Sequence, residues 1–350
     1  MKVVVLAGGL STERNVSLTS ATVICNTLRK KGYQAILVDA FLGCPDPGMP
    51  LEDLFIMDGS LVPEPPISTI EPDLAAVKAS RPDQSASFFG PNVIEICRLA
   101  DICYLGLHGG CGENGQVQAA LDMHGIRYTG PGYLGSAIAM HKGYTKAIFE
   151  KYGVPTPAGV LLARADANRP VSDFGFELPV VVKTCSGGSS IGVYIPHTDE
   201  EYHRAVKDAF LSDNEVILEQ FISGREFAVG VLAGKALPVI EIIPKDGWFD
   251  YAHKYQDGFS SEICPADIDD ETAKKMMDAS ELAARALSLD VYSRMDFILD
   301  PNGDVYCLEA NSLPGMTPAS LIPKEAVAAG ISYEELCEII ITESMKKYEN

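Results

Sequence analysis

The chain has 350 residues, of which 47% are hydrophobic and 22% are charged, so its composition is that of a globular protein large enough for roughly two or three domains. The formal net charge of −20 argues against non-specific binding to nucleic acid or to anionic membranes, because both require a basic face. No stretch approaches the ~18 apolar residues of a membrane helix, and the nine cysteines form no C-x-x-C pair, so we expect reduced thiols in a cytoplasmic protein.

The first part of the chain predicts a parallel α/β domain, residues 1–130. The expected elements are a buried strand, an amphipathic helix that ends at a glycine, two further strands, a second helix and a short last strand, at residues 2–7, 16–32, 33–40, 100–107, 115–125 and 126–130. The order strand, helix, strand is typical of parallel sheets. Residues 42–92 contain nine of the 22 prolines, and we interpret them as an irregular insertion.

The rest of the chain predicts two α+β domains, residues 131–219 and 220–350. In the first of these, helical patterns and strands are expected at residues 133–153, 158–163, 179–183, 191–195, 199–211 and 215–221. In the second, long strands, a helix, a hairpin and a closing amphipathic helix are expected at residues 225–234, 235–243, 269–288, 292–311 and from 332 onward.

Two stretches match G-x-G-x-x-G, "GCGENG" at 110–115 and "GPGYLG" at 130–135. Neither has the context of a dinucleotide site, and the second places a proline in the turn. Tight turns that open helices explain both, although their backbone N–H groups could still meet a ligand carboxylate. A dinucleotide-dependent dehydrogenase remains the alternative from a different functional class.

The loop "KTCSGGSSIG" follows the strand that ends at Lys183. Small residues allow the backbone N–H groups of a loop to fold over an anion, and a lysine at the strand end adds a positive charge. The order is not that of a P-loop, in which the lysine follows the glycines. A hairpin turn with a solvated lysine explains the loop equally well when it is taken alone.

The hairpin "SRMDFILDPNGDVYCLEAN" predicts a cluster of polar side chains on one face. If the turn consists of residues 302–303, the favoured Asn-Gly pair, Asp296 lies opposite Glu309 and Arg294 lies opposite Asn311. Residues two apart on a strand share a face, so all four side chains point to the same side.

Two facing carboxylates repel each other unless a cation lies between them. Together with a neighbouring amide oxygen they form a hard-oxygen ligand set of the kind that Mg²⁺ takes alongside substrate phosphates. The alternative is a solvated strand face, and a slip of one residue in register would separate the two carboxylates.

Taken together, these motifs and the sequence around them resemble the D-alanine–D-alanine ligases of the ATP-grasp superfamily. The likeness spans nearly the whole chain apart from residues 42–92. It rests on seven blocks in order: "GGLSTERNVSLTSA", "LHGGCGENGQVQ", "YTGPGYLGSAIAMHK", "VVVKTCSGGSSIGV", "EVILEQFISGREF", "FDYAHKY" and "RMDFILDPNGDVYCLEANSLPGMTPASL".

The resemblance implies an α/β, three-domain ATP-grasp fold, with an N-terminal parallel α/β domain and two α+β domains that clamp ATP. It also implies an ATP-dependent ligation of two D-alanines for peptidoglycan precursor synthesis. Phosphorylation turns the first carboxylate into an acyl phosphate, which supplies the leaving group that a carboxylate lacks, and the second amine then attacks it.

Residues at the family's nucleotide positions are Lys142, Lys183, Gly188, Ser190, Glu219, Gln220, Ile222, Glu226 and Lys254. Of these, Lys142 and Lys183 would contact the phosphates, the 186–190 loop would close over them, and Glu226 would bind the ribose hydroxyls. Asp296, Glu309 and Asn311 match the family's magnesium ligands, which implies ATP with Mg²⁺, two ions by the family pattern, or Mn²⁺ in their place.

Residues at the family's catalytic and substrate positions are Glu13, His108, Ser189, Lys254, Tyr255, Arg294, Gly315, Ser320 and Leu321. Arg294 and the Gly315 N–H would stabilise the oxyanion, and Glu13 would hold the first ammonium with His108 beside that substrate. Ser320 and Leu321 would receive the second carboxylate. Taken alone, Glu13 could instead offset a helix dipole and His108 could be a hydrogen-bonded core residue.

Specificity is expected to depend on Tyr255, which in the dipeptide-forming relatives connects to a serine, here Ser189, and to Glu13. Ligases that prefer D-lactate lack this tyrosine, so its presence favours an amine nucleophile. Gln220 departs from a common lysine beside the adenine. A D-alanine–D-serine ligase of the same fold remains the alternative, and the family likeness implies a homodimer that binds neither nucleic acid nor membrane.

Overall fold

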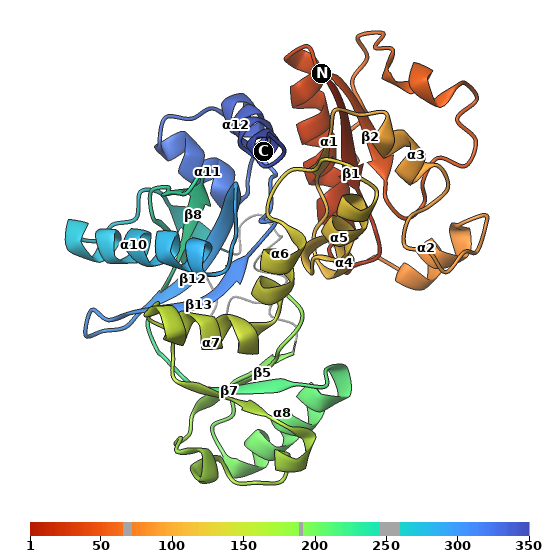
Figure 1. Cartoon of the computed structure of the whole chain (residues 1–350). Helices are drawn as coiled ribbons and strands as arrows, with labels where there is room; N and C mark the ends of the chain where they lie inside the picture. The colour runs from red at the N-terminus through yellow and green to blue at the C-terminus, as the bar shows by residue number, and fades with distance from the viewer. Residues whose placement is uncertain (66–71, 189–191, 245–259, 350) are drawn as a thin grey trace.

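The computed structural model describes residues 1–65, 72–188, 192–244 and 260–349, and it is a mixed α/β structure built on three sheets (Figure 1). The first sheet is parallel and has the order β2-β1-β3. The second has four antiparallel strands in the order β4-β7-β5-β6, and the third has six strands, β11-β10-β8-β12-β13 with β9 paired to β8. This agrees with the expected parallel unit followed by two α+β units.

The parallel sheet consists of β1 (Lys2–Ala7), β2 (Gln34–Asp39) and β3 (Ile102–Leu105). The central strand β1 is an unbroken apolar run because both of its faces are covered, and residues 3–7 are fully buried. Helix α1 (Arg14–Lys30) connects β1 to β2, as the sequence predicted. Residues 126–130, expected as a strand, contribute a single parallel bridge between Cys103 and Tyr128.

The other helices of this part of the chain are short. They are η1 (Leu51–Phe55), α2 (Leu74–Ser80), α3 (Val93–Arg98), α4 (Gly110–Glu113) and α5 (Gln116–Met123). Three of them lie in or next to the proline-rich stretch, so the expectation of an irregular segment at 42–92 holds only in part.

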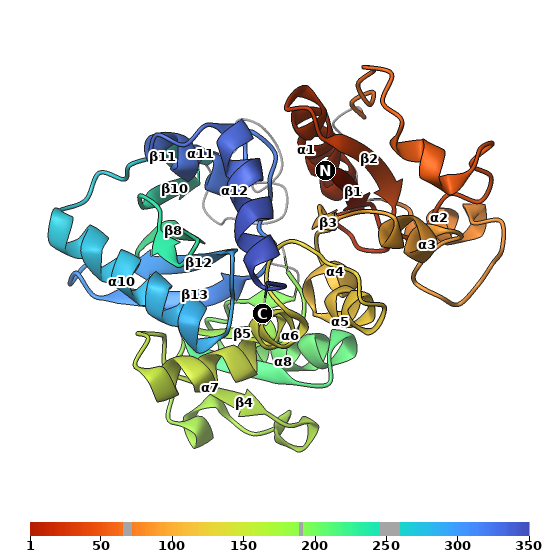
Figure 2. The same cartoon turned by 45° about the horizontal axis from the view of Figure 1, so that its top comes forward.

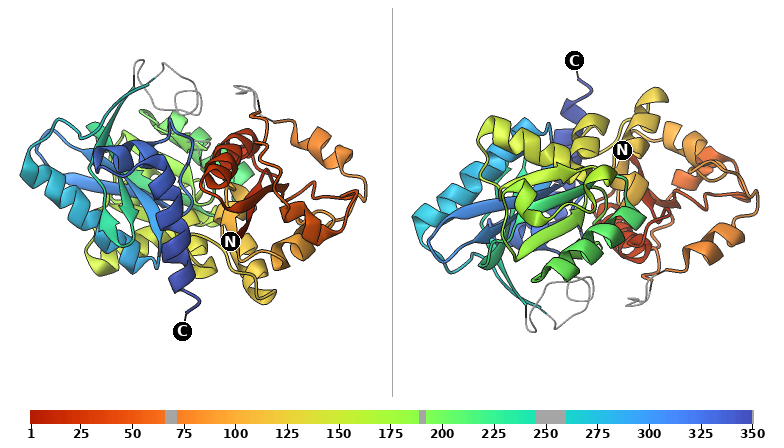
Figure 3. Two further views of the ribbon diagram at one scale, coloured as in Figure 1. Left: turned by 90° about the horizontal axis from the view of Figure 1, so that it is seen from above. Right: turned by 90° about the horizontal axis from the view of Figure 1, so that it is seen from below.

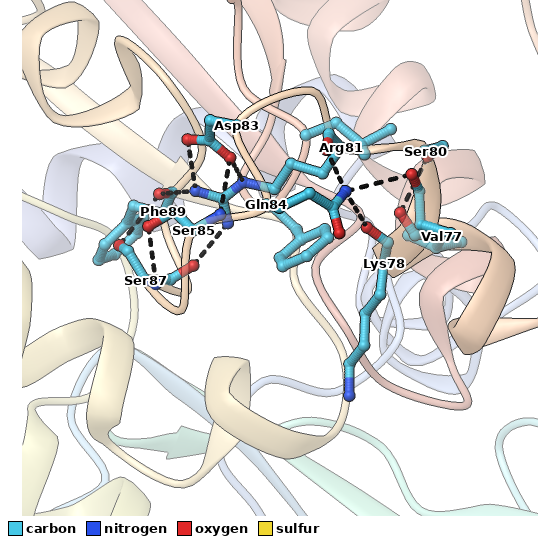
Figure 4. A network of polar contacts seen from close by, with 12 residues as sticks. Val77, Lys78, Ser80, Arg81, Asp83, Gln84, Ser85, Ser87 and Phe89 are labelled. Atoms are coloured by element: carbon cyan, nitrogen blue, oxygen red, sulfur yellow. Dashed lines mark hydrogen bonds and ion pairs between the residues drawn. The ribbon is translucent and has the colours of Figure 1, made fainter.

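Arg81 organises the segment that leads back to the parallel sheet. Figure 4 shows its guanidinium between the Asp83 carboxylate and the backbone carbonyls of Ser87 and Phe89. The guanidinium also lies 4.8 Å from the centre of the Phe41 ring, a cation–π distance. Because the side chain is only 2% exposed, these contacts replace nearly all of its hydration.

The four-stranded sheet is formed by β4 (Gly159–Leu162), β5 (Val180–Thr184), β6 (Val193–Tyr194) and β7 (Val216–Gln220). Helix α8 (Asp199–Ser212) covers it with an apolar face, and Thr198 caps that helix by accepting the N–H of Glu201. The short helices η2 (Arg164–Asp166) and η3 (Val171–Phe174) lie in the connection between β4 and β5.

The six-stranded sheet contains β8 (Arg225–Leu232), β9 (Lys235–Ala236), β10 (Ile240–Pro244), β11 (Ser260–Ile263), β12 (Tyr292–Leu299) and β13 (Val305–Asn311). Helix α10 (Asp270–Ala286) packs on it (Figure 2). Helix α7 (Lys142–Tyr152) follows α6 (Tyr133–Met140) and contacts both β13 and the strands β4 and β7, so it lies between the two antiparallel sheets.

The last two helices are α11 (Leu321–Ala328) and α12 (Tyr333–Lys346). Helix α12 begins with the capping box of Ser332 and Glu335, close to the predicted start. It packs beside α1, where Lys31 and Glu338 form an ion pair of 2.9 Å, and its apolar face joins the core of the parallel sheet (Figures 1 and 3).

We expect Arg81→Leu to loosen residues 81–91. Two partly buried carbonyls and a carboxylate would lose their donor, and a loss of about 2 kcal/mol would raise the locally open population roughly 30-fold. Chymotrypsin cleavage after Phe88 and Phe89, followed by mass spectrometry, measures this population. The control is Lys78→Leu, an exposed side chain on the neighbouring helix, and equal cleavage rates in the two variants would contradict the role of Arg81.

Candidate active site

A cleft of about 410 Å³ opens between the three sheets and brings together residues that are far apart in the chain. It is lined by every described residue that the sequence assigned to a site: Glu13, His108, Lys142, Lys183, Gly188, Glu219, Gln220, Ile222, Glu226, Arg294, Asp296, Glu309, Asn311, Gly315, Ser320 and Leu321. The remaining four, Ser189, Ser190, Lys254 and Tyr255, lie outside the described residues.

The hairpin β12–β13 supplies the polar wall of the cleft. Asp296 pairs with Glu309 and Arg294 pairs with Asn311, as predicted. The predicted two-residue turn is wrong, however, because the Asp300 N–H donates to the Asp304 carbonyl around a three-residue loop, 301–303.

A bulge compensates for this longer loop. Near the turn, Phe297 lies opposite Cys307, whereas one step further Asp296 lies opposite Glu309. Leu308 is therefore the extra residue on β13, and it shifts the register by one position. The turn was predicted one residue too short and the bulge was not predicted, and the two errors cancel at the carboxylates.

Arg294 is held in the cleft by Asp296. Its Nε and Nη2 atoms donate to the two carboxylate oxygens at 2.6 and 2.9 Å, and the Asn311 amide donates to the same carboxylate at 3.1 Å. Burial alone would lower the pKa of Arg294, but Asp296 above all, with Glu309 and Glu325, raises it. The guanidinium is therefore a fixed, permanently charged group in this wall.

Lys142 approaches the other carboxylate of the hairpin. Its Nζ lies 3.6 Å from Glu309 Oε2 and donates to the Gly187 carbonyl at 2.7 Å. The residue begins α7, and its own N–H donates to the Cys185 carbonyl at 2.8 Å. The start of α7 is thereby tied to the glycine-rich loop that follows β5.

Glu219 bridges two lysines deep in the cleft. Its carboxylate lies 2.6 Å from Lys183 and 2.8 Å from Lys146, and the glutamate is 3% exposed. Burial alone would raise the pKa of Glu219, but the two ammonium groups lower it. Burial lowers the pKa of Lys146, although the same carboxylate acts to raise it.

Lys146 was missed by the sequence analysis, although a signal existed. It lies four residues after Lys142 on one helix, and this spacing places two side chains on the same face. It also donates to the Thr156 hydroxyl at 2.9 Å and to the Pro157 carbonyl. Because its ammonium group is fully engaged with the protein, we interpret it as a group that positions Glu219.

The parallel unit contributes an acid–imidazole pair to the cleft, in which His108 is buried and Glu113 is half-buried. His108 lies 3.8 Å from Glu113, and its two ring nitrogens lie 3.2 Å from the Leu313 carbonyl and the Ser20 hydroxyl. Burial alone would lower the pKa of His108, but Glu113 raises it, with a smaller contribution from Glu13. The sequence analysis missed Glu113. This residue ends the short helix α4, which follows His108 in the chain and brings the carboxyl group to the imidazole.

The segment after β13 forms the end of the cleft. The Ser320 hydroxyl accepts the Thr317 N–H at 3.1 Å and closes a turn just before α11. A Cβ atom on Gly315 would lie 2.9 Å from that hydroxyl, so a larger residue there would displace the Ser320 side chain from this turn. Gly315, Ser320 and Arg294 all line the cleft.

The ligand chemistry of the hairpin fits a hard divalent cation. Two opposed carboxylates and an amide line the cleft within one strand pair. Within residues 1–65, 72–188, 192–244 and 260–349, no three His, Cys, Asp or Glu side chains converge on one point. Asparagine and the phosphates of a substrate are thus the natural sources of the further oxygens.

The comparisons with known proteins agree with one another. The chain matches two family profiles, "D-ala D-ala ligase N-terminus" over residues 2–131 and "D-ala D-ala ligase C-terminus" over residues 148–342. Among curated relatives, the D-alanine–D-alanine ligase of Pediococcus pentosaceus is 45% identical over 351 residues, covering 100% of this chain and 99% of that protein. The one from Lacticaseibacillus casei is 44% identical, covering 99% and 97%.

Two solved structures share the fold over the whole of this chain. The D-alanine–D-alanine ligase of Bacillus anthracis, complexed with ATP, superimposes with a TM-score of 0.75 at 30% identity and is covered completely. The enzyme from Coxiella burnetii gives a TM-score of 0.76 at 25% identity, with 95% of it covered. The expected ATP-grasp architecture is thereby confirmed.

The contacts of Glu219 predict the effect of removing its charge. Glu219→Gln would leave two buried ammonium groups facing each other, and breaking a buried ion pair in this way costs about 3–5 kcal/mol. We expect faster hydrogen exchange in β5 and β7 at pH 7, measured by mass spectrometry. Gln220→Ala, an exposed position on the same strand, is the control.

The same contacts fix the direction of the pH dependence. Because the pKa of Glu219 is lowered on folding, its stabilising contribution is present above the ordinary glutamate value of 4.5 and is lost as the pH falls through the lower folded value. The difference between the wild type and Glu219→Gln must therefore shrink in acid. A difference that grows on acidification would contradict the ion-pair assignment.

Proposed function

The chain belongs to the D-alanine–D-alanine ligase family, and we propose that it carries out the ATP-dependent joining of two D-alanines with the residues of this cleft. The observation that carries the proposal is the meeting of two groups of side chains across it. Lys142 and Lys183 come from one side, and the hairpin with Arg294, Asp296 and Glu309 comes from the other. Phosphoryl transfer needs cations and positioned carboxylates in this arrangement.

We propose that the nucleotide lies between β5, β7 and the hairpin. Lys183 would contact phosphate while Glu219 holds its ammonium in place. Residues 220–224 and Glu226, at the end of β7 and the start of β8, line the cleft and would surround the adenosine, with Glu226 at the ribose. Gly188 lines the same cleft beside Lys142 and would approach the phosphates through its backbone.

The hairpin would hold magnesium. Asp296, Glu309 and Asn311 are the proposed ligands of two Mg²⁺ ions, with Mn²⁺ as a substitute, because their oxygens share one face. The metal supplies charge neutralisation of the phosphates. Before the metal binds, Arg294 and Lys142 lie against the same carboxylates and balance their charge.

The first D-alanine would lie against the parallel unit. Glu13 would bind its ammonium. The absence of a side chain at Gly109 leaves room for the Glu13 carboxylate, because a Cβ atom there would lie 2.5 Å from it. His108, which is buried beside Glu113, would lie next to this substrate. Its contact with Glu113 would hold the loop that contains His108 in place.

The second D-alanine would be held where α11 begins. Ser320 and Leu321 would receive its carboxylate, so that its amine faces the acyl phosphate of the first. Arg294 and the Gly315 N–H would bind the oxygen on which negative charge develops when the amine attacks. Phosphate then leaves, and D-alanyl-D-alanine and ADP remain as the other products.

Location and assembly are part of the proposal. Within the described residues, no helix is both long and apolar enough to cross a bilayer. All nine cysteines lie in the described residues and are unpaired, which supports a cytoplasmic enzyme of peptidoglycan precursor synthesis. We further propose a homodimer and the division of the chain into domains at residues 1–130, 131–219 and 220–350.

Removal of one carboxylate tests the metal assignment. We expect Glu309→Ala to lower kcat by about 10³-fold or more, because the phosphates would lose a fixed counter-charge. Calorimetry should show that Mg²⁺ tightens ADP binding to the wild type but adds little in the variant. Asp304→Ala, an exposed carboxylate in the turn of the same hairpin, should behave as the wild type; near-native turnover of Glu309→Ala would refute the assignment.

Competition between nucleophiles tests the substrate. With D-alanine, D-serine and D-lactate supplied together, we expect D-alanyl-D-alanine as the main product. The ester formed with D-lactate should be a minor product, because Tyr255 favours an amine nucleophile. Phosphate release and mass spectrometry of the products measure the outcome. A predominance of D-alanyl-D-serine would reassign the second substrate, and release of phosphate without any dipeptide would remove the proposed function.

A further inference from the structure

Glu325 is a fully buried carboxyl group on α11 that none of the roles above uses. Its side chain is 0% exposed. Oε1 accepts the backbone N–H of Gly230 at 2.9 Å, and Oε2 has no hydrogen-bond partner among the described residues. Buried acids with half of their hydrogen-bonding capacity unused are rare, so this residue requires an explanation.

The N–H that Glu325 accepts lies at a gap in the sheet. Strand β10 pairs with β8 only as far as Ala228, and β9 pairs with it from Val231 onward. Gly230 lies between these two ladders, where its carbonyl accepts the Leu237 N–H. Glu325 thus supplies the acceptor that a strand would otherwise provide, which a buried backbone N–H needs.

The same contact brings α11 very close to the strand. A Cβ atom at Gly230 would lie 2.5 Å from Ile322 Cδ1 and 2.8 Å from Glu325 Oε2, so a larger residue there would displace these two side chains of α11. On its other side, Gly230 pairs with Arg294 of β12. Gly230 therefore contacts the helix on one side and the strand of the catalytic arginine on the other.

Helix α11 begins at Leu321, directly after Ser320, and both residues line the cleft. Glu325 follows Leu321 by four residues, so one helical turn separates its hydrogen bond from the end of the cleft. We propose that Glu325 is a positioning residue for the second amino acid, because its bond to Gly230 fixes the first turn of α11 relative to the strand of Arg294. This inference rests on the proposed function, which assigns the second carboxylate to Ser320 and Leu321.

The carboxyl can do this as a neutral group. The pKa of Glu325 is raised to about 8, chiefly by burial and to a smaller extent by Asp296. The Gly230 N–H and Arg294 act in the opposite direction and lower it. The charged groups near it, Arg294 and Asp296, lie on β12, and Gly230 on β8 carries no charge. A neutral amide of the same shape can accept the same N–H, whereas an alkyl side chain cannot.

The experiment compares Glu325→Gln with Glu325→Leu in the full-length enzyme. Initial rates over a range of D-alanine concentrations yield two successive substrate constants, and separate titrations yield the KM for ATP. We expect Leu to raise the second D-alanine constant about tenfold, the equivalent of one lost hydrogen bond to a buried donor, and to leave the first constant and the ATP KM within about twofold. Gln should stay close to the wild type in all three.

Two further variants separate positioning from folding. Val327→Ala lies on the exposed side of the same helix and should change nothing. Gly230→Ala pushes α11 away from the other side of the contact and should reproduce the selective rise of the second constant, even if Glu325→Leu proves insoluble. Melting temperatures of all variants report the loss of stability that a purely structural role would produce.

The outcomes are distinguishable from a failure of the proposed function. If the wild type forms no dipeptide, the proposed function is wrong. If the wild type is active but Glu325→Leu and Gly230→Ala raise all constants equally, or only lower the melting temperature, the positioning role is wrong. A Gln variant as impaired as Leu would likewise overturn it, because the bond to Gly230 would not be the cause.

Discussion

Charge neutralisation among the buried and half-buried ionic groups of the cleft is the constraint on which the site depends. Cations that would bind phosphate cannot face one another in a medium of low dielectric without a counter-ion. Glu219 lies between Lys146 and Lys183, Asp296 faces Arg294, and Glu309 lies near Lys142. Each carboxylate is carried by a strand, so the sheets fix the geometry of the charges, and the substrate enters a cleft whose charges are already arranged.

The hairpin illustrates how far the sequence could predict this arrangement. Alternation along two strands determined which side chains share a face, and the pairing of Asp296 with Glu309 was correct. The turn was wrong because Asp300 accepts backbone N–H groups within the loop and thereby favours three residues over the two of an Asn-Gly turn. The bulge at Leu308 leaves no signature in the pattern, because this residue only lengthens the apolar run 305–308 that precedes Glu309.

Other parts of the site depend on burial, which a sequence does not display. Lys146 and Glu113 look like ordinary surface charges on helices, and only the fold brings them against Glu219 and His108. Glu325 lies in a helix that the periodicity did not predict, and its partner is a backbone N–H exposed by a gap between two ladders. Local sequence pattern predicted the succession of strands and helices along most of the chain, whereas the contacts between the units required the three-dimensional structure.

The position of α12 has a consequence for how the molecule is made. Leu336, Cys337, Ile340 and Ile341 belong to the same apolar core as the strands β1 to β3, although more than 200 residues separate them from β3 in the chain. At typical synthesis rates, roughly 10–50 s separate the emergence of β3, which completes the first sheet, from that of its covering helix. During this interval the nascent N-terminal unit exposes the surface that α12 later buries, so its core is completed only after α12 has been synthesised.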